Sequence, residues 1–243
     1  MKYMGSKNRI AKHLLPIMLK EADLRGFATW VEPFVGGANM IDKVPDYFER
    51  IGYDFNPHTI QAMIDIRDIP EQLLDEVSEE YYKSIKGTPA SSVTSWVRFG
   101  CSFGGKFENG YARENPNSSS AMSRGFVRNF AAEVKRNAIK QSPNIQNVNF
   151  ICDSYENLSF ENCLIYCDPP YQNTTGYKTG YFDHEKFFDW CREQAKNNLV
   201  FVSEYTAPDD FIEVWSGEVK TNFASTRTTA THKAVEKLFQ VKG

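Results

Sequence analysis

The chain has 243 residues, enough for one sizeable α/β core and a small insertion. Its formal net charge is −3, which argues against uniform affinity for nucleic acid. Its five cysteines are an odd number without a C-x-x-C pair, so we expect neither a disulfide framework nor a metal site. We find no signal peptide and no apolar stretch long enough to span a bilayer, so we expect a cytoplasmic protein that is not held in a membrane.

Helical and strand-like patterns alternate along the first third of the chain. Residues 9–22 carry apolar side chains at helical spacing. Short strands are predicted at 29–31 and 51–53. Residues 57–83 are predicted to be mostly helical, with a break at Pro70.

The middle of the chain is polar and contains several turn signals. We expect a helix at 91–101 that packs against the core, followed by a hairpin or an ordered loop at 103–112. Residues 115–123 are rich in Ser and Asn and predict a segment that is mobile without a ligand. A further helix is predicted at 125–141.

The last third predicts the remaining strands, at 148–152, 163–167 and 199–203, a helix at 183–197, and a closing antiparallel hairpin of 219–223 and 235–241. Cys152, Cys163 and Cys167 lie in these apolar runs and are predicted to be small core residues. The pattern predicts an α/β fold with a mostly parallel sheet. Residues 1–65 and 148–243 would form the sheet domain, and residues 66–147 would be an insertion into it.

The sequence Asp168-Pro169-Pro170-Tyr171 directly follows the apolar run 163–167. An apolar run that ends at prolines predicts a buried strand, which places Asp168 at the sheet edge where open α/β sheets bind ligands. Two prolines form a stiff turn whose carbonyl groups are not committed to a strand ladder. A rigid set of acceptors beside an aromatic ring suits a planar amino group. By themselves these residues are equally compatible with an ordinary turn.

A second motif lies upstream, where a predicted strand leads into Glu32-Pro33-Phe34 and then Gly36-Gly37, with a helix expected next. Glycines at this position allow the backbone to approach a ligand closely. Asp54 ends the following strand, at the usual position of an acid that accepts ribose hydroxyls. The full G-x-G-x-x-G spacing is absent. The motif therefore favours a nucleoside ligand over a dinucleotide.

The charge is unevenly distributed along the chain. Residues 86–150 contain nine Lys or Arg and three acids, a balance of +6, and the rest of the chain carries −9. A basic insertion in an acidic body predicts a surface that faces DNA. The alternative is that surface charge simply varies from one segment to the next.

Several blocks of this chain resemble the Dam-type DNA adenine-N6 methyltransferases of bacteria and their phages. Lys2-Tyr3-Met4-Gly5-Ser6-Lys7 is similar to the family's N-terminal block, 32–37 to its glycine turn, 168–171 to its catalytic [DNS]-P-P-[YFW], and 231–239 to its closing strand. The resemblance covers the chain except for roughly 66–147. It implies a Rossmann-like methyltransferase sheet that binds S-adenosylmethionine, with a helical and hairpin insertion that recognises double-stranded DNA.

For catalysis, the resemblance implies that Asp168 and the Pro169 carbonyl accept the two N6 hydrogens of an adenine flipped out of the duplex, while Tyr171 stacks on the base. Lys7 would contact the donor's carboxylate, Asp54 its ribose and Asp153 its adenine. The full implied donor site comprises Tyr3, Lys7, Glu32, Phe34, Gly36, Gly37, Asp54, Asp153 and Asp168. Simpler alternatives are a solvated Lys7, a core Phe34 and an Asp153 that caps a helix or turn.

The insertion departs from the family pattern at one position. Relatives that methylate GATC carry a guanine-reading arginine where this chain has Ser102. We therefore expect a target that is not restricted to GATC. The residues implied to contact DNA are Lys2, Ser102, Lys106, Arg113, Arg124 and Arg128. No protein partner is indicated.

Two other classes of function compete with DNA adenine methylation. One is methylation of another amino group, such as cytosine N4, RNA adenine or a glutamine side chain. Asp168 argues against cytosine and glutamine, because those enzymes more often carry Ser and Asn before the two prolines. The other is a DNA-binding module without catalysis, which the presence of Asp168, the glycine turn and Asp54 disfavours.

Overall fold

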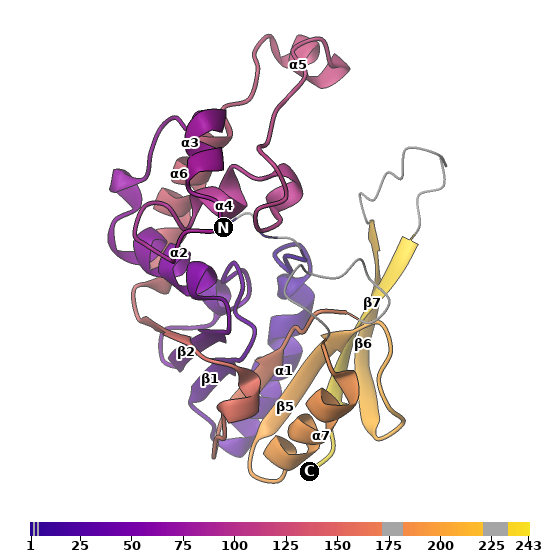
Figure 1. Cartoon of the computed structure of the whole chain (residues 1–243). Helices are drawn as coiled ribbons and strands as arrows, with labels where there is room; N and C mark the ends of the chain where they lie inside the picture. The colour runs from indigo at the N-terminus through magenta and orange to yellow at the C-terminus, as the bar shows by residue number, and fades with distance from the viewer. Residues whose placement is uncertain (2, 4, 172–181, 221–232) are drawn as a thin grey trace.

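The computed structural model describes residues 1, 3, 5–171, 182–220 and 233–243. Within them, seven strands form one sheet in the order β3-β2-β1-β4-β5-β7-β6 (Figure 1). The strands are β1 Thr29–Glu32, β2 Glu49–Asp54, β3 Val148–Cys152, β4 Leu164–Cys167, β5 Leu199–Glu204, β6 Phe211–Lys220 and β7 Lys233–Val241. Strands β1 to β5 run parallel, and β7 is antiparallel to both β5 and β6. The predicted α/β class, with a mostly parallel sheet and an antiparallel C-terminal hairpin, is confirmed.

The strand order reverses between β1 and β4. From β1 the chain proceeds to β2 and β3 on one side, whereas β4 leads to β5 and β7 on the other. Val31 of β1 pairs with Ile165 of β4, so the two strands end side by side. Ligands of open α/β sheets bind where such a reversal opens a crevice at the carboxyl ends of the strands. The fold therefore brings the glycine turn after β1 close to the residues after β4.

The two faces of the sheet pack against different helices, because successive strand residues point to opposite faces. Trp30, Leu164 and Tyr166 belong to the cluster that includes α1 (Ala11–Arg25), α2 (Pro57–Asp68) and α6 (Phe130–Gln141). Val31 and Ile165 belong to a second cluster, with Phe187 and Cys191 of α7 (His184–Ala195). The parallel strands are thus covered on both faces, as parallel sheets usually are.

The segment between α2 and β3 contributes no strand to the sheet. It contains short helices, α3 Glu79–Ser84, α4 Val97–Gly100 and α5 Ser119–Arg124. The 3₁₀ turns along the described chain are η1 Ile41–Lys43, η2 Pro70–Gln72, η3 Phe103–Gly105, η4 Ser142–Ile145 and η5 Tyr155–Asn157. In Figure 1, α5 lies far from the sheet at the end of two long chain segments. The division into a sheet domain and an insertion at 66–147 stays a prediction.

Several predicted elements of the middle segment are wrong in extent. Of the helix predicted at 91–101, only the four residues of α4 form. Val93 has a left-handed φ of +67°, and its N–H donates to Asp65 Oδ2 at 2.8 Å, which interrupts helical geometry before α4. Of the two alternatives predicted for 103–112, a hairpin or an ordered loop, the structure has the ordered loop, with the turn η3 and one antiparallel bridge between Ser102 and Tyr111. Part of the polar segment 115–123 belongs to α5.

Other corrections concern the sheet domain. The glycine turn is followed by the 3₁₀ turn η1 and not by an α-helix. Strand β6 begins at Phe211, earlier than the predicted 219–223, of which 221–223 lie outside the described residues. Cys152 is exposed, because β3 is an edge strand and this position faces outward at its end. Cys163 and Cys167 are buried as predicted, and all five cysteines are free.

Candidate active site

The Lys7 ammonium lies between two carboxylates at the carboxyl end of β4. Its Nζ is 2.8 Å from Asp168 Oδ1 and 3.1 Å from Glu236 Oε1. The side chains of Lys7 and Glu236 are each 8% exposed, and that of Asp168 is 23% exposed. Strand β4 is buried along its whole length, and the prolines after Asp168 prevent it from continuing. The predicted catalytic acid is therefore joined to the N-terminal block and to β7.

The ring of Tyr171 is fixed by three different groups. Its hydroxyl donates a hydrogen bond to Glu236 Oε1. Lys7 Nζ lies 4.5 Å from the ring centroid, a cation–π distance. Tyr205 meets the ring edge-on, with 4.7 Å between the centroids and an interplanar angle of 86°. Asp168 and Tyr171 are thus brought together, as the sequence predicted, but with Glu236 as an additional partner.

The charges in this cluster influence one another. Burial raises the pKa of Asp168 to about 6, with Lys7 opposing the rise and Glu236 adding to it. Burial alone would lower the pKa of Lys7, but Asp168 and Glu236 together hold it above its ordinary value. Burial and the two carboxylates raise the pKa of Tyr171 well above its usual range. At neutral pH the cluster therefore holds an ionised acid, a lysine cation and a neutral phenol that can donate.

Asp54 and the glycine turn form a second part of the site. Asp54 Oδ2 accepts the Gly36 N–H at 3.2 Å, and its Oδ1 accepts the Asn56 N–H at 2.9 Å. Burial raises the pKa of Asp54 to about 6, and the hydrogen bonds from Asn56 and Gly36 oppose the rise. Gly36 has a φ of +47°, and a Cβ there would lie 2.9 Å from Cε1 of Tyr3. A Cβ on Gly37 would lie 2.7 Å from the Cβ of Tyr3.

The remaining predicted donor residues have mixed surroundings. Asp153 is half-buried beside Asp54, and its N–H donates to the Asp54 carbonyl at 3.2 Å. Glu32 is 3% exposed and accepts the Trp30 indole N–H at 2.9 Å, and burial raises its pKa well above its usual range. Phe34 packs against Tyr155, with ring centroids 5.4 Å apart. Glu32 and Phe34 thus contact the core, whereas Tyr3, Gly36, Gly37, Asp54 and Asp153 lie together.

Two residues of the site were missed by the sequence analysis. Glu236 lies in the block that resembles the family's closing strand, but only the folded chain shows that it meets Lys7 and Tyr171. Phe55 directly follows Asp54 and is 51% exposed, although it is a large aromatic residue. Its position after a carboxylate at a strand end could have indicated a surface on which a nucleobase stacks.

The arginines predicted to contact DNA are each paired with a carboxylate. Arg113 pairs with Glu79, Arg124 with Glu114 and Arg128 with Glu133. Lys106 is half-buried and forms no ion pair with the part of the chain that the structure describes. Lys2 lies outside the described residues.

Ser102 is fully buried, contrary to the placement expected of a DNA-contacting residue. Its hydroxyl oxygen accepts the Asn109 N–H at 2.9 Å and the Tyr82 hydroxyl at 3.1 Å. The side chain is therefore held inside the turn, away from a surface that a base edge could reach. The adjacent Phe103 is exposed, and Met122, Phe126 and Val127 are further exposed apolar side chains of the insertion.

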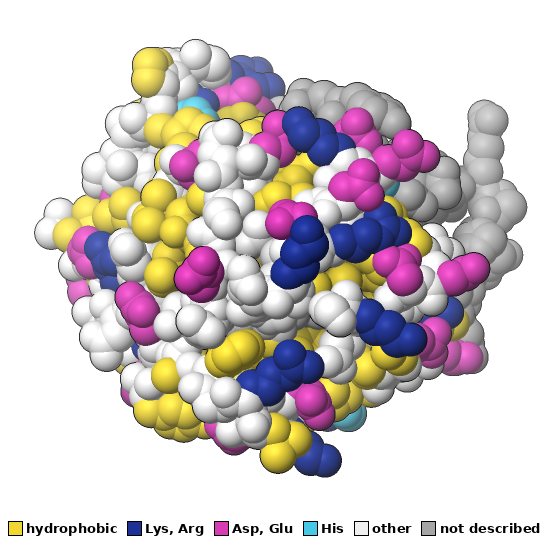
Figure 2. Space-filling model, turned by 90° about the horizontal axis from the view of Figure 1, so that it is seen from below, with side chains coloured by type: hydrophobic (Ala, Val, Ile, Leu, Met, Phe, Trp, Pro, Cys, Tyr) yellow, Lys and Arg dark blue, Asp and Glu magenta, His cyan; other side chains and the backbone are white. Residues whose placement is uncertain are grey.

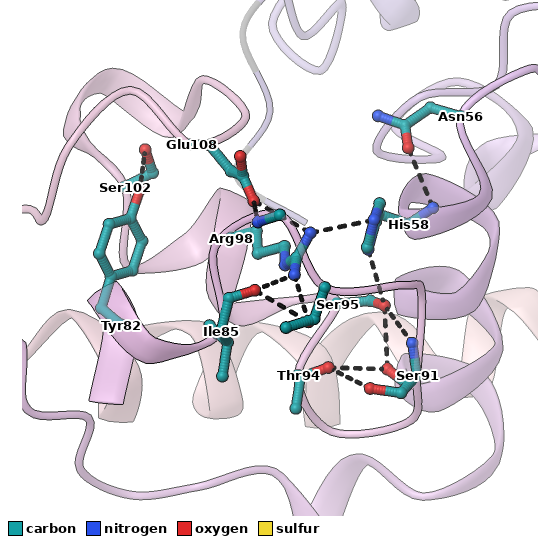
Figure 3. A network of polar contacts seen from close by, with 12 residues as sticks. Asn56, His58, Tyr82, Ile85, Ser91, Thr94, Ser95, Arg98, Ser102 and Glu108 are labelled. Atoms are coloured by element: carbon teal, nitrogen blue, oxygen red, sulfur yellow. Dashed lines mark hydrogen bonds and ion pairs between the residues drawn. The ribbon is translucent and has the colours of Figure 1, made fainter. Parts of the chain in front are cut away.

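A buried polar network connects α2 with the insertion (Figure 3). Arg98 is 1% exposed, and its guanidinium lies 3.0 Å from His58 Nε2 and 3.0 Å from Glu108 Oε1. His58 Nδ1 lies 3.3 Å from Ser95 Oγ. The N–H of His58 donates to Asn56 Oδ1 at 3.0 Å, and Asn56 lies two residues after Asp54. The network therefore attaches the insertion to the helix that begins beside the glycine turn.

Two kinds of feature are absent from the described ranges. They contain no cluster of three or more His, Cys, Asp or Glu side chains that could hold a metal ion. Among the same residues, every helix is too short or too polar to cross a membrane.

Comparison with known proteins gives one curated relative and several structural neighbours. Type II methyltransferase M.FokI of Planomicrobium okeanokoites is 24% identical over 217 residues, which cover 79% of this chain and 31% of that protein. The chain thus spans about a third of the length of this relative. Thermoplasma acidophilum 1320 aligns with a TM-score of 0.47 and 9% identity, covering 96% of this chain and 88% of that one. Putative methylase HI0767 of Haemophilus influenzae aligns with a TM-score of 0.41 and 9% identity, covering 98% and 99%.

The profile of one protein family matches most of the chain. It covers residues 3–90 and 106–224, which include the glycine turn, Asp54 and the Asp168-to-Tyr171 motif. The resemblance inferred from the sequence blocks is confirmed by this match. The chain belongs to the D12 class of N6 adenine-specific DNA methyltransferases.

Proposed function

We propose that this chain transfers a methyl group from S-adenosylmethionine to N6 of an adenine that has been turned out of double-stranded DNA. The observation that carries the proposal is the position of Asp168, Pro169 and Tyr171 after β4, beside the glycine turn and Asp54 at the reversal of strand order. This arrangement joins acceptors for an amino group to a site suited to a nucleoside.

The residues after β4 act on the target base. Asp168 and the Pro169 carbonyl accept the two N6 hydrogens, which favours the charge that develops on nitrogen and directs its lone pair. Tyr171 stacks on the base. Turning the nucleotide out of the duplex costs a few kcal/mol in lost stacking and pairing. The N6 proton becomes acidic only after the methyl group has arrived, so Asp168 serves as an acceptor without being a strong base.

The residues after β1 and β2 fit the donor. S-adenosylmethionine supplies an electrophilic methyl group on a sulfonium. Gly36 and Gly37 have no Cβ that would collide with Tyr3, which leaves the turn's backbone close to the site, and Asp54 presents a buried carboxylate suited to ribose hydroxyls. Phe55 is exposed beside Asp54, where its ring can stack on the donor adenine. We assign Lys7 to Asp168 and not to the donor's carboxylate, because its ammonium already lies between two acids.

Radiolabelled methyl transfer to DNA of mixed sequence tests the proposal. The wild-type chain should incorporate label, and Asp168→Ala should lower the rate ~10²–10³-fold, the usual loss for a preorganised acceptor. Asp189→Ala, which removes an exposed acid of α7, is the control and should leave the rate unchanged. A variant at Asp168 that retained more than about a tenth of the rate would contradict the assigned role. An inactive wild-type chain would favour a silent DNA-binding module.

Long-read sequencing of DNA from cells that express the chain identifies the modified base and its motif together. We expect N6-methyladenine in a motif that is not restricted to GATC, because Ser102 is buried and the family's guanine-reading arginine is absent there. N4-methylcytosine, or methylation confined strictly to GATC, would contradict this expectation.

A further inference from the structure

Glu236 is a carboxylate at an almost completely buried position. It lies on β7, which pairs with both β5 and β6, and it is 6% exposed. Removing a carboxylate from water is costly unless partners compensate for the lost hydration. The partners of Glu236 are the Lys7 ammonium at 3.1 Å and the Tyr171 hydroxyl. Both belong to the cluster around Asp168.

Charge balance does not explain Glu236. Lys7 already has Asp168 as an ion-pair partner at 2.8 Å, so the buried Glu236 leaves one cation facing two carboxylates. A cluster that served stability alone would be better balanced with a neutral residue at this position. The second carboxylate therefore points to a role in the reaction.

The hydrogen bonds of Lys7 indicate what that role is. An ammonium has three N–H donors, and Lys7 directs them toward Asp168, Glu236 and the Gly5 carbonyl, which is 3.2 Å away. An incoming N6 amine competes with Lys7 for the Asp168 carboxylate. With Glu236 present, Lys7 keeps a charged partner when the amine takes its place at Asp168. Without Glu236, binding of the amine at Asp168 would leave the Lys7 ammonium with the Gly5 carbonyl and no charged partner.

Glu236 also fixes the aromatic platform. The hydrogen bond from the Tyr171 hydroxyl restrains the tilt of a ring that Lys7 and the edge of Tyr205 also contact. From these contacts, and resting on the proposed function, we propose that Glu236 is a positioning residue for methyl transfer. It receives the Lys7 ammonium when the target amine binds Asp168, and it holds Tyr171 in the orientation that stacks on the base.

The pH dependence of the chemical step distinguishes this role from simple structural support. Among the described residues, the titratable groups around Asp168 are Lys7, Glu236 on β7, Tyr171, Tyr166 on β4, Tyr205 and Glu32 on β1. Glu236 raises the pKa of Asp168, whereas the Tyr171 hydroxyl lowers it. Glu236→Gln should therefore move the acid limb of the rate profile to lower pH, and Tyr171→Phe should move it to higher pH.

The experiment measures single-turnover methyl transfer to duplex DNA as a function of pH for wild type, Glu236→Gln, Tyr171→Phe and the double variant. We expect Glu236→Gln to slow transfer about 10- to 100-fold, as misplacement of reacting groups does. The two substitutions remove the same hydrogen bond, so their effects on the rate should not add. The double variant should therefore be no slower than the slower of the two single variants. Glu213→Gln is the matched control, because it removes an exposed acid of the same hairpin that is paired with Lys237.

Each outcome decides a different question. An unchanged rate in Glu236→Gln, or a slower rate with an unmoved acid limb and additive effects, would overturn the inference. Calorimetric titration with S-adenosylmethionine shows whether the variant is folded.

If Glu236→Gln does not fold, Glu236→Asp keeps the charge on a shorter side chain. It should slow transfer without moving the acid limb downward, and a wild-type rate would refute the role. An inactive wild-type chain would refute the proposed function instead.

Discussion

Asp54 carries a charge in a place where burial disfavours it. The N–H groups of Gly36 and Asn56 each bond to one of its oxygens, yet the pKa of the carboxyl is raised from its ordinary 3.8 to about 6. The ionised carboxylate therefore lowers the stability of the free chain, and we infer that it serves to bind a ligand, a common compromise at functional sites. Two measurements test this.

Asp54→Asn should weaken S-adenosylmethionine binding and leave duplex binding nearly unchanged. A charged hydrogen bond from a ribose hydroxyl contributes ~1.5–3 kcal/mol, which corresponds to a loss of at least tenfold in affinity. Calorimetric titration with the donor and with duplex DNA measures both affinities. An unchanged donor affinity would remove Asp54 from the site.

The same substitution should alter how stability depends on pH. The pKa of Asp54 in the folded chain lies above the unfolded value of 3.8. Between about pH 6 and pH 4, the folded chain therefore holds a proton on Asp54 that the unfolded chain has already released. Acidification from pH 7.5 to 5 should therefore stabilise the wild type relative to Asp54→Asn by roughly 1 kcal/mol, for a pKa shift from 3.8 to about 6. Urea denaturation of the donor-free proteins at both pH values measures the difference. Equal changes in the two proteins would show that Asp54 titrates normally.

Gly36 permits a test of the close contact with Tyr3. Gly36→Ala places a Cβ 2.9 Å from the Tyr3 ring at a φ of +47°. Gly26→Ala is the control, since Gly26 has a φ of +72° with no neighbouring atom within 4 Å of the added Cβ. Both variants should lose ~1–2 kcal/mol of stability from the left-handed backbone, but only Gly36→Ala should also weaken donor binding. Equal donor affinities would separate Tyr3 from the donor site.

At the scale of elements, α2 and the insertion are joined by the Arg98 network. His58 Nε2 accepts from Arg98, so the ring is neutral in the fold. Burial and the guanidinium hold the pKa of His58 below its ordinary 6.5. The stability that this histidine contributes is therefore complete above about pH 6.5 and is lost on acidification, opposite in sign to Asp54.

Arg98→Met should destabilise the chain, because it leaves Glu108 and His58 without their shared partner in a buried setting. Breaking such a pair typically costs about 3–5 kcal/mol. Arg136→Met, at an exposed position of α6, should change stability by less than about 0.5 kcal/mol. Urea denaturation compares the two variants. A loss at Arg98 no larger than at Arg136 would mean that the network does not hold the insertion.

The sequence predicts those elements whose local pattern agrees with their surroundings. Strands β1, β4 and β5 are short apolar runs bounded by turn residues, and the placement of Asp54 and Asp168 follows from where such runs end. The left-handed Val93 depends on a hydrogen bond to Asp65, a residue of another element, so no local pattern reveals it. The meeting of Lys7, before α1, with Glu236 of β7 likewise joins segments far apart in the chain.

At the scale of the whole molecule, the basic segment predicted from the sequence is partly neutralised by acids from other segments. The basic segment 86–150 lies against acids from the preceding stretch, for Glu79 pairs with Arg113 and Asp75 with Lys135. On the face shown in Figure 2, Lys and Arg side chains lie among Asp and Glu side chains and form no patch of one sign. In the proposed function, DNA would compete with these internal carboxylates for Arg113, Arg124 and Arg128.

Lys106 is the insertion residue best suited to a phosphate, since it has no ion pair among the described residues. Lys106→Ala should weaken binding to all sequences and reduce the slope of log affinity against log salt by about one unit. Lys196→Ala, beyond α7 and paired with Glu193, is the control and should leave the slope unchanged. Filter binding or fluorescence anisotropy at several salt concentrations measures it. A loss confined to one sequence would assign Lys106 to a base edge instead.

The position of β7 has a consequence for synthesis. Every other described strand precedes β7 in the chain, yet β7 lies between β5 and β6 and supplies Glu236 to the cluster around Lys7. A nascent chain on the ribosome therefore cannot close the sheet until this strand has emerged, and such pairing between distant segments forms slowly. Unfinished chains hold the glycine turn and Asp168 but lack Glu236, the second carboxylate beside Lys7. During translation, strands β1 to β5 are therefore synthesised before the cluster around Lys7 can be completed.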